Sequence, residues 1–283
     1  MMRNRFPPYS AFCIARRHTS PPLPPNPVRR LPLPESEWPD RAAESIDVWD
    51  TNAAFWDDFM GDDSNRFHRE LVRPAAERLL DVKRGDHVLD IACGNGNFSR
   101  RLVELGATVT AIDGSSPMID AARERSERLG VTDIDARVLD VTDEAALSTL
   151  SNHTFDSAVS NMGLMDMAVI DPLFKTLARV LRPGGRFVFC ITHPCFQTPG
   201  AGRAFEETEE EGVVVTRAYM KISSYIEPEY FKGIGIKGQP QPQLYFHRPL
   251  HLLLDSGFRA GFVVDGIEEP TFAPLQDASR PGS

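Results

Sequence analysis

The sequence of 283 residues contains no apolar run of the about 18–20 residues that a membrane-spanning helix needs. Basic residues do not outnumber acidic ones, and the formal net charge of −9 argues against nucleic acid as a partner, because phosphate binding needs a basic face. Cysteine is scarce, and no two cysteines form a C-x-x-C pair, so neither a metal site nor a disulfide framework is indicated. These absences predict a protein without a membrane span in a reducing compartment, with the cytoplasm as the expected location.

Acidic residues are also missing before Glu35, and the first 34 residues hold six arginines and nine of the 23 prolines. Such a segment cannot bury a core, so residues 1–39 are predicted to form a disordered tail. One interpretation of residues 1–34 is a transit peptide, which would direct import into an organelle. The prolines disfavour the amphipathic helix of such peptides. The favoured interpretation is a flexible tail or a start codon placed too early.

The most informative stretch lies at residues 87–102, in a chain whose 41% apolar content is ample for a packed core. Its apolar run, residues 88–91, is typical of a buried parallel strand and includes one carboxylate, Asp90. Gly94 and Gly96 follow, and apolar residues then recur at helical spacing. A strand, a glycine turn and a helix in this order direct backbone N–H groups toward a ligand, which the glycines allow to approach closely.

Two classes of ligand use this arrangement. Dinucleotide sites need G-x-G-x-x-G, but Ser99 occupies the third glycine position, and Asp90 is poorly placed beside a pyrophosphate. A carboxylate suits a ligand with a cationic end. The stretch VLDIACGNGNF closely resembles the first motif of class I S-adenosylmethionine-dependent methyltransferases. The resemblance implies that this motif holds S-adenosylmethionine through Asp90, Ala92, Cys93, Gly94 and Gly96.

Two further carboxylates end predicted strands. Asp113 ends a buried strand 23 residues after Asp90, where the resemblance implies contacts with the ribose hydroxyls; the alternative is that it caps the next helix. A third strand, predicted at residues 135–139, ends in Asp140, which the resemblance places near the adenine amino group. The other cofactor contacts expected from the family pattern are Gly114, Met118, Val141, Asn161 and Met162.

The remaining elements extend the same pattern. The stretch ARVLRPGGRFVF, leading into a fifth strand at residues 186–191, is highly typical of the family. The resemblance implies an α/β fold with a doubly wound, mostly parallel, Rossmann-like sheet and N-terminal helices, formed by one domain over residues 40–283. The family normally ends with an antiparallel seventh strand beside the fifth. Residues 271–283 are too short and polar to supply it, so we expect either a six-stranded sheet or a truncated chain.

The acceptor side is predicted less directly. His193 follows the fifth strand and is hypothesised to orient the acceptor or take its proton; the alternative is a polar strand-end residue bonded to backbone. Residues 197–246 interrupt the alternation of strands and helices and are rich in aromatic residues, so we predict a substrate lid, with a dimer surface or a separately packed flap as alternatives. The predicted substrate-binding residues are Trp56, for which a core position is the alternative, and Tyr219, Tyr225 and Tyr245.

The resemblance implies methyl transfer from S-adenosylmethionine to a small-molecule acceptor. O-methylation is the first expectation, and N-methylation, C-methylation and a quinone-type acceptor stay open. A second interpretation is a protein that binds S-adenosylmethionine without methylating, as a regulator or a cofactor-assisted cyclase. A third, an NAD-dependent oxidoreductase, is disfavoured by Ser99 and Asp90. The chain is expected to act as a monomer or a homodimer.

Overall fold

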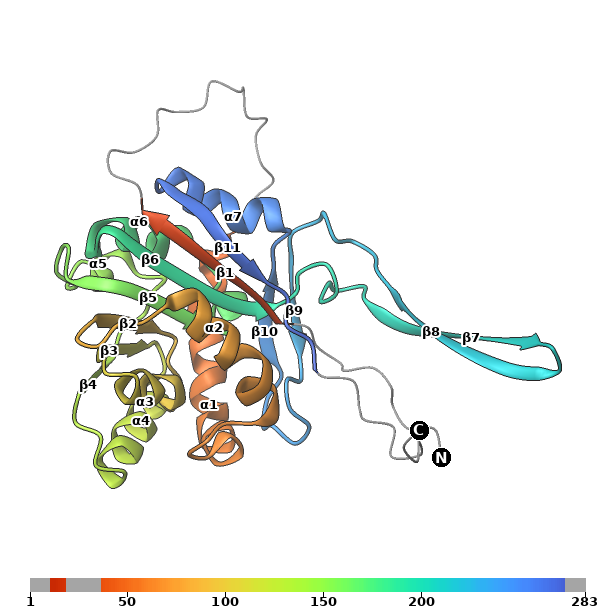
Figure 1. Ribbon diagram of the computed structural model, residues 1–283, viewed down its shortest axis with the longest axis horizontal. Coiled ribbons are helices and arrows are strands. Elements are labelled where there is room, and N and C mark those ends of the chain that lie inside the picture. Colours follow the sequence, from red (N-terminus) through yellow and green to blue (C-terminus); the bar gives the residue numbers. More distant parts are fainter. Residues whose placement is uncertain (1–10, 19–36, 273–283) are drawn as a thin grey trace, which may run out of the picture.

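The computed structural model describes residues 11–18 and 37–272. Within these ranges, seven strands form a central sheet in the order β11-β1-β6-β5-β2-β3-β4 (Figure 1). The five strands from β6 to β4 are parallel to one another, and β1 is antiparallel to both of its neighbours. The strands of this sheet are β1 (Ala11–His18), β2 (His87–Ile91), β3 (Thr108–Asp113), β4 (Ile134–Val138), β5 (Phe155–Asn161), β6 (Leu181–Thr192) and β11 (Phe262–Glu268).

Helices cover both faces of this sheet. One face packs against α2 (Arg73–Leu80), α3 (Asn97–Glu104) and α4 (Ser116–Arg128), and the other against α5 (Glu144–Leu147), α6 (Asp171–Val180) and α7 (Leu250–Arg259). The central strands are therefore apolar on both sides. In β2, Val88 belongs to the core on the side of α2, α3 and α4, and Leu89 to the core on the side of α5, α6 and α7; both are completely buried. This arrangement confirms the predicted doubly wound, Rossmann-like α/β fold.

The position beside β6 is occupied by β1, which comes from the N-terminal segment (Figure 1). Its residues Cys13, Ile14 and Ala15 are buried, and on its other side β1 pairs with β11. Two predictions are therefore wrong: residues 11–18 are not disordered, and the sheet is not limited to six strands. The pattern AFCIA was too short to outweigh the surrounding arginines and prolines. Residues 1–10 and 19–36, including most of the proposed transit peptide, lie outside the described residues.

A disulfide joins β1 to β6. Cys13 lies directly opposite Cys190 in the antiparallel register, and their sulfur atoms are bonded. The prediction that the cysteines form no disulfide is therefore wrong. The pairing spans 177 residues of sequence and depends on strand register, which local cysteine spacing does not reveal. Cys93 and Cys195 are free thiols.

The N-terminal helix α1 (Ala42–Met60), which follows the short helix η1 (Pro39–Arg41), packs against α4 and against the later strand β10. A π-helical turn, η2 (His68–Val72), leads directly into α2, whose first turn contains Pro74. The stretch from His68 to Leu80 thus consists of two helical segments of different geometry. None of the helices in the described ranges is long and apolar enough to cross a membrane.

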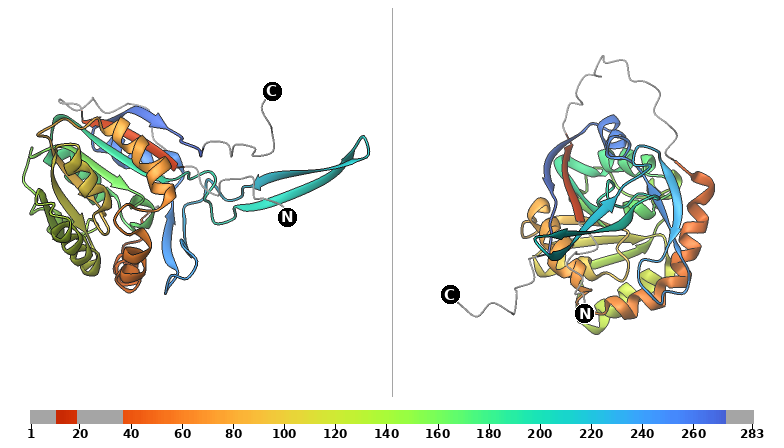
Figure 2. Two further views of the ribbon diagram at one scale, coloured as in Figure 1. Left: turned by 60° about the horizontal axis from the view of Figure 1, so that its bottom comes forward. Right: turned by 90° about the vertical axis from the view of Figure 1, so that its right-hand side faces the viewer.

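The segment 197–246 divides into two antiparallel strand pairs. The pair β7 (Gly202–Glu210) and β8 (Val213–Lys221) forms an arm that extends away from the body in Figure 1 and in the left view of Figure 2. The pair β9 (Glu229–Gly233) and β10 (Gln243–His247) packs beside α1. Only the second pair is placed to cover the carboxyl edge of the sheet, where parallel strands direct their ligand-binding loops.

Candidate functional site

A cavity of about 720 Å³ lies at the carboxyl ends of the parallel strands, within the range of small-molecule sites. Its walls come from the turn after β2, the tips of β3 and β5 and the segment after β4, and it is covered by α1 and the β9–β10 pair. It brings together ten of the predicted cofactor residues: Ala92, Cys93, Gly94, Asp113, Gly114, Met118, Asp140, Val141, Asn161 and Met162. Asp90 and Gly96 lie behind this wall.

The two glycines of the turn have different functions. Both have positive φ, +55° at Gly94 and +74° at Gly96. A Cβ on Gly94 would meet nothing within 4 Å, so the missing side chain leaves space at the cavity wall. A Cβ on Gly96 would come within 3.1 Å of the Ala122 side chain and 3.2 Å of the Arg100 guanidinium. Gly94 therefore makes room for a ligand, whereas Gly96 lets the turn pack closely against α4.

Asp90 lies behind the glycine turn and binds the start of α3. It is 1% exposed, and Ser99 at the start of α3 donates a hydrogen bond from Oγ to its Oδ2 at 2.6 Å. Burial raises the pKa of Asp90 to about 7, the Ser99 hydrogen bond lowers it, and the nearby Asp113 raises it further. Asp90 thus acts on the ligand site through the turn and through its charge.

The Asp113 carboxylate joins the tip of β3 to the glycine turn. Its Oδ2 accepts a hydrogen bond from the Gly94 N–H and its Oδ1 one from the Ser115 N–H, each at 2.9 Å. Burial raises the pKa of Asp113, and these two N–H groups oppose the shift. The cap of α4 is Ser115, whose Oγ accepts from the Met118 N–H, so the alternative that Asp113 caps this helix is wrong. Each carboxylate oxygen keeps capacity for a second hydrogen bond.

The site fits the predicted cofactor, S-adenosylmethionine. Asp113 and Asp140 line the cavity at neighbouring strand tips, which suits a ligand that is cationic and carries hydroxyl and amino groups. The Asn161 Oδ1 and Trp56 Nε1 atoms are buried without a hydrogen-bond partner among the described residues. A polar ligand in the cavity would satisfy such atoms, whose burial otherwise costs free energy.

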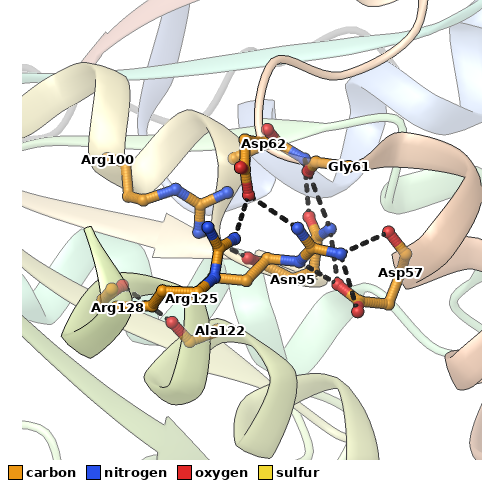
Figure 3. Close-up of polar contacts among 10 residues, drawn as sticks. Asp57, Gly61, Asp62, Asn95, Arg100, Ala122, Arg125 and Arg128 are labelled. Carbon is orange, nitrogen blue, oxygen red and sulfur yellow. Dashed lines mark hydrogen bonds and ion pairs between the residues drawn. The ribbon is translucent and has the colours of Figure 1, made fainter.

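A network of charged side chains ties α1 to the glycine turn (Figure 3). Arg125 of α4 donates to Asp57 near the end of α1, through Nε and through Nη2, the latter at 2.9 Å, and to Asp62 through Nη1 at 2.6 Å. Asn95 of the turn donates to the same Asp57 at 2.9 Å. Because Arg125 and Asp57 are mostly buried, this bidentate pair is stronger than an exposed ion pair. The network therefore fixes α1 against the turn.

We expect Arg125→Ala to destabilise the fold by about 1–3 kcal/mol, because Asp57 loses a charge-assisted bidentate contact. It should also weaken S-adenosylmethionine binding about tenfold, since Asn95 loses its fixed partner. Thermal unfolding and calorimetric titration measure both effects. Arg128→Ala is the matched control, because Arg128 is half exposed and contacts only Asp62 within the network. Equal losses in the two variants would contradict the assigned role of the network.

The predicted substrate residues separate into two groups. Trp56 and Tyr245 line the cavity, with the Trp56 ring 5.3 Å from Trp49 and the Tyr245 ring stacked 5.4 Å from Phe231. Their role in substrate binding stays a prediction. Tyr219 lies on the β7–β8 arm, 48% exposed, and donates to Glu206.

Tyr225 lies where the arm returns to the body. Its hydroxyl accepts from the Leu250 N–H and its carbonyl bonds with His247. Neither Tyr219 nor Tyr225 lines the cavity, so the cavity does not support these two assignments, which stay predictions. The sequence shows an aromatic insertion but not its division into two strand pairs.

His193 also lies outside the cavity wall. Its Nε2 is 2.9 Å from Glu269 Oε1, and its Nδ1 accepts from the Cys195 N–H at 3.1 Å. These contacts are the ones that the alternative, a polar strand-end residue bonded to backbone, expects, and the catalytic role of His193 stays a prediction. Other cavity residues, which include His68, Asp166 and Gln243, are not among those predicted from the sequence. Asp166 had a usable signal, a lone carboxylate in the apolar stretch GLMDMAVI just after a strand.

Comparison with known proteins agrees with this geometry. A family model described as a methyltransferase domain matches residues 89–189. A demethylmenaquinone methyltransferase from Corynebacterium kroppenstedtii is 32% identical over 129 residues, which cover 46% of this chain and 50% of that protein. A malonyl-[acyl-carrier protein] O-methyltransferase from Pseudescherichia vulneris is 34% identical over 125 residues, covering 43% of this chain and 46% of that protein. The chain thus spans about half the length of the curated relatives it matches.

Among solved structures, an S-adenosylmethionine-dependent methyltransferase from Mesorhizobium loti superimposes with a TM-score of 0.56 and 28% identity. The match covers 72% of this chain and 85% of that one. The structural match therefore extends beyond residues 89–189, the part that the family model matches.

Proposed function

We propose that this chain, a member of the class I S-adenosylmethionine-dependent methyltransferases, transfers the methyl group of that cofactor to a small-molecule acceptor. The observation that carries the proposal is the single cavity in which the turn after β2 and the tips of β3, β4 and β5 meet. An alternative, binding without methyl transfer, differs in its product, because S-adenosylhomocysteine forms only when methyl moves.

The bound cofactor supplies an electrophilic methyl group on a sulfonium, so the residues of the chain have mainly to orient and enclose the reactants. Asp113 would hold the ribose hydroxyls, and Asp140 with Val141 the adenine. The backbone at Gly94 and the Asn161 amide would hold the methionine end. Helix α1 and the β9–β10 pair line the cavity and would exclude water from the reacting groups.

The acceptor side favours a small molecule with an apolar body. Two aromatic pairs, Trp49 with Trp56 and Phe231 with Tyr245, form part of this wall. Flat or extended apolar molecules gain free energy against such rings. O-methylation of a hydroxyl is our first expectation, and C-methylation of a quinone-type ring the second. The relatives described above include an enzyme named as an O-methyltransferase and one named for demethylmenaquinone.

The proposal predicts that Asp113→Ala weakens S-adenosylmethionine binding about 10- to 100-fold, because hydrogen bonds to a charged group contribute about 1.5–3 kcal/mol. Calorimetric titration of S-adenosylmethionine, and separately of NAD, measures this directly. Asp120→Ala is the matched control, since Asp120 lies on α4 with an exposed side chain paired only with Arg123. NAD binding, or equal affinity of the two variants for S-adenosylmethionine, would overturn the assignment. Release of S-adenosylhomocysteine with candidate hydroxyl compounds then identifies the acceptor.

A further inference from the structure

Asp166 is a cavity carboxyl that the proposed cofactor contacts do not use. It ends the short helix η3 (Leu164–Asp166), which follows the tip of β5, and it lines the cavity. Its N–H donates to the Gly163 carbonyl at 2.9 Å, and its own carbonyl accepts from Ser45 Oγ of α1 at 2.8 Å. The backbone of Asp166 is therefore fixed by the β5 loop on one side and by the covering helix on the other.

The carboxyl group itself is poorly compensated. The Oδ1 atom is buried without a hydrogen-bond partner among the described residues. The carboxyl group as a whole receives a hydrogen bond from the Gln243 side chain of β10. Gln243 is 2% exposed and is held in turn by Gln239 at 3.3 Å. Asp166 as a whole is half-buried, but an ionised Oδ1 would be short of both water and donors, which is costly.

The charged groups around Asp166 do not neutralise it. Helix α1 faces it with the neutral Ser45 hydroxyl and β10 with the neutral Gln243 amide, whereas β3 contributes the acidic Asp113. Arg248 donates to the carbonyls of Met167 and Ala168 in the following segment. Burial, and then the charge of Asp113, raise the pKa of Asp166 well above its usual range, against the hydrogen bond from Gln243. Burial therefore favours the neutral form of this carboxyl in the ligand-free protein.

A cation in the cavity changes that balance. S-adenosylmethionine carries a sulfonium, whereas S-adenosylhomocysteine, its demethylated product, is a neutral thioether at the same atom. We propose that Asp166 ionises when the sulfonium cofactor binds and takes the proton of the acceptor hydroxyl as the methyl group is transferred. This inference rests on the proposed function and adds to it a proton acceptor for the reaction.

The step balances in atoms and charge. The bond between the methyl carbon and sulfur breaks, and its electron pair remains on sulfur. A lone pair of the acceptor oxygen forms the new bond to the methyl carbon, and the hydroxyl proton passes to an oxygen of Asp166. One positive and one negative charge thus disappear together, so that no isolated charge remains in the buried cavity.

The test needs no acceptor. Binding of S-adenosylmethionine and of S-adenosylhomocysteine is measured near pH 7 by calorimetry in buffers with different ionisation enthalpies, which gives the protons released. The two ligands share their adenosine and amino-acid parts, so a difference reports the sulfonium charge alone. We expect S-adenosylmethionine to release up to one proton more, since the site favours the neutral form of Asp166 until a cation binds. Asp166→Asn should abolish the difference, while Glu37→Gln, which removes a partly buried carboxyl of raised pKa outside the cavity wall, should retain it.

A second variant covers the case in which Asp166→Asn does not fold. Gln243→Leu removes the hydrogen bond that favours the ionised carboxyl, so the excess proton should be released at a higher pH. With an acceptor in hand, Asp166→Asn should lower turnover about 10²-fold or more.

The outcomes separate the two proposals. Absence of excess proton release in the wild-type chain overturns the inference, as does its persistence in Asp166→Asn or an unchanged pH in Gln243→Leu. In those cases the proposed function stands if both ligands bind and S-adenosylhomocysteine is formed. Failure of both ligands to bind overturns the proposed function and the inference with it.

Discussion

Ile14→Asp is expected to unfold the chain at room temperature, although residue 14 lies in a segment whose composition predicts disorder. Ile14 is completely buried, and its strand partners are Phe189 of β6 and Ile267 of β11. An unpaired carboxylate at this position costs several kcal/mol, and the variant also loses the packing of the isoleucine. Since whole domains are stable by only about 5–15 kcal/mol, this loss is large enough to abolish folding. Circular dichroism and urea unfolding measure it.

Ile14→Val is the matched control. It removes one buried methylene and should lower the free energy of unfolding by only about 1 kcal/mol. If Ile14→Asp unfolded in urea like the wild type, β1 would not be part of the sheet, and β6 and β11 would each lack their neighbour. The prediction therefore tests the topology of the sheet as well as one contact.

The part of the fold that could be predicted from the sequence is encoded locally. The run 88–91, the glycines that follow it and the helical spacing after Gly96 lie within about one strand-turn-helix unit, whose geometry dictates where its ligand lies. Asp113 and Asp140 recur at the same position in later units. Parallel strands bring such tips to one edge of the sheet. Their meeting in one cavity could therefore be predicted without knowing any long-range contact.

Features that depend on long-range pairing could not be predicted in this way. β1 pairs with β6 across 177 residues, and neither its composition nor cysteine spacing indicates that register. The same holds for the aromatic insertion, where Tyr219 and Tyr245 differ only in which strand pair carries them. His193 has plausible chemistry for a proton acceptor, but its ring is bound to Glu269 and to the Cys195 N–H.

Asp90→Asn should stabilise the ligand-free protein at pH 8 by roughly 2–4 kcal/mol, because burial raises the pKa of Asp90 from 3.8 to about 7. The folded state therefore binds a proton that the unfolded state releases between about pH 4 and pH 7. Stability of the wild type falls as pH rises through this window, and above it the full cost of a buried carboxylate is present. The variant has no charge to bury, so its advantage should vanish near pH 4. Urea unfolding at several pH values measures the slope.

Ser99→Ala provides a control of opposite sign. It keeps the Asp90 carboxyl but removes the hydrogen bond from Ser99 Oγ that lowers its pKa, so stability at pH 8 should fall. Equal pH slopes in the wild type and Asp90→Asn would contradict the assigned cost. Cofactor binding explains why the chain keeps a buried carboxylate that lowers its stability. The negative charge of Asp90 should favour binding of the cationic methionine end. Asp90→Asn should therefore bind S-adenosylmethionine about tenfold more weakly. Higher stability and weaker binding in one variant would show that the carboxylate is retained for its ligand.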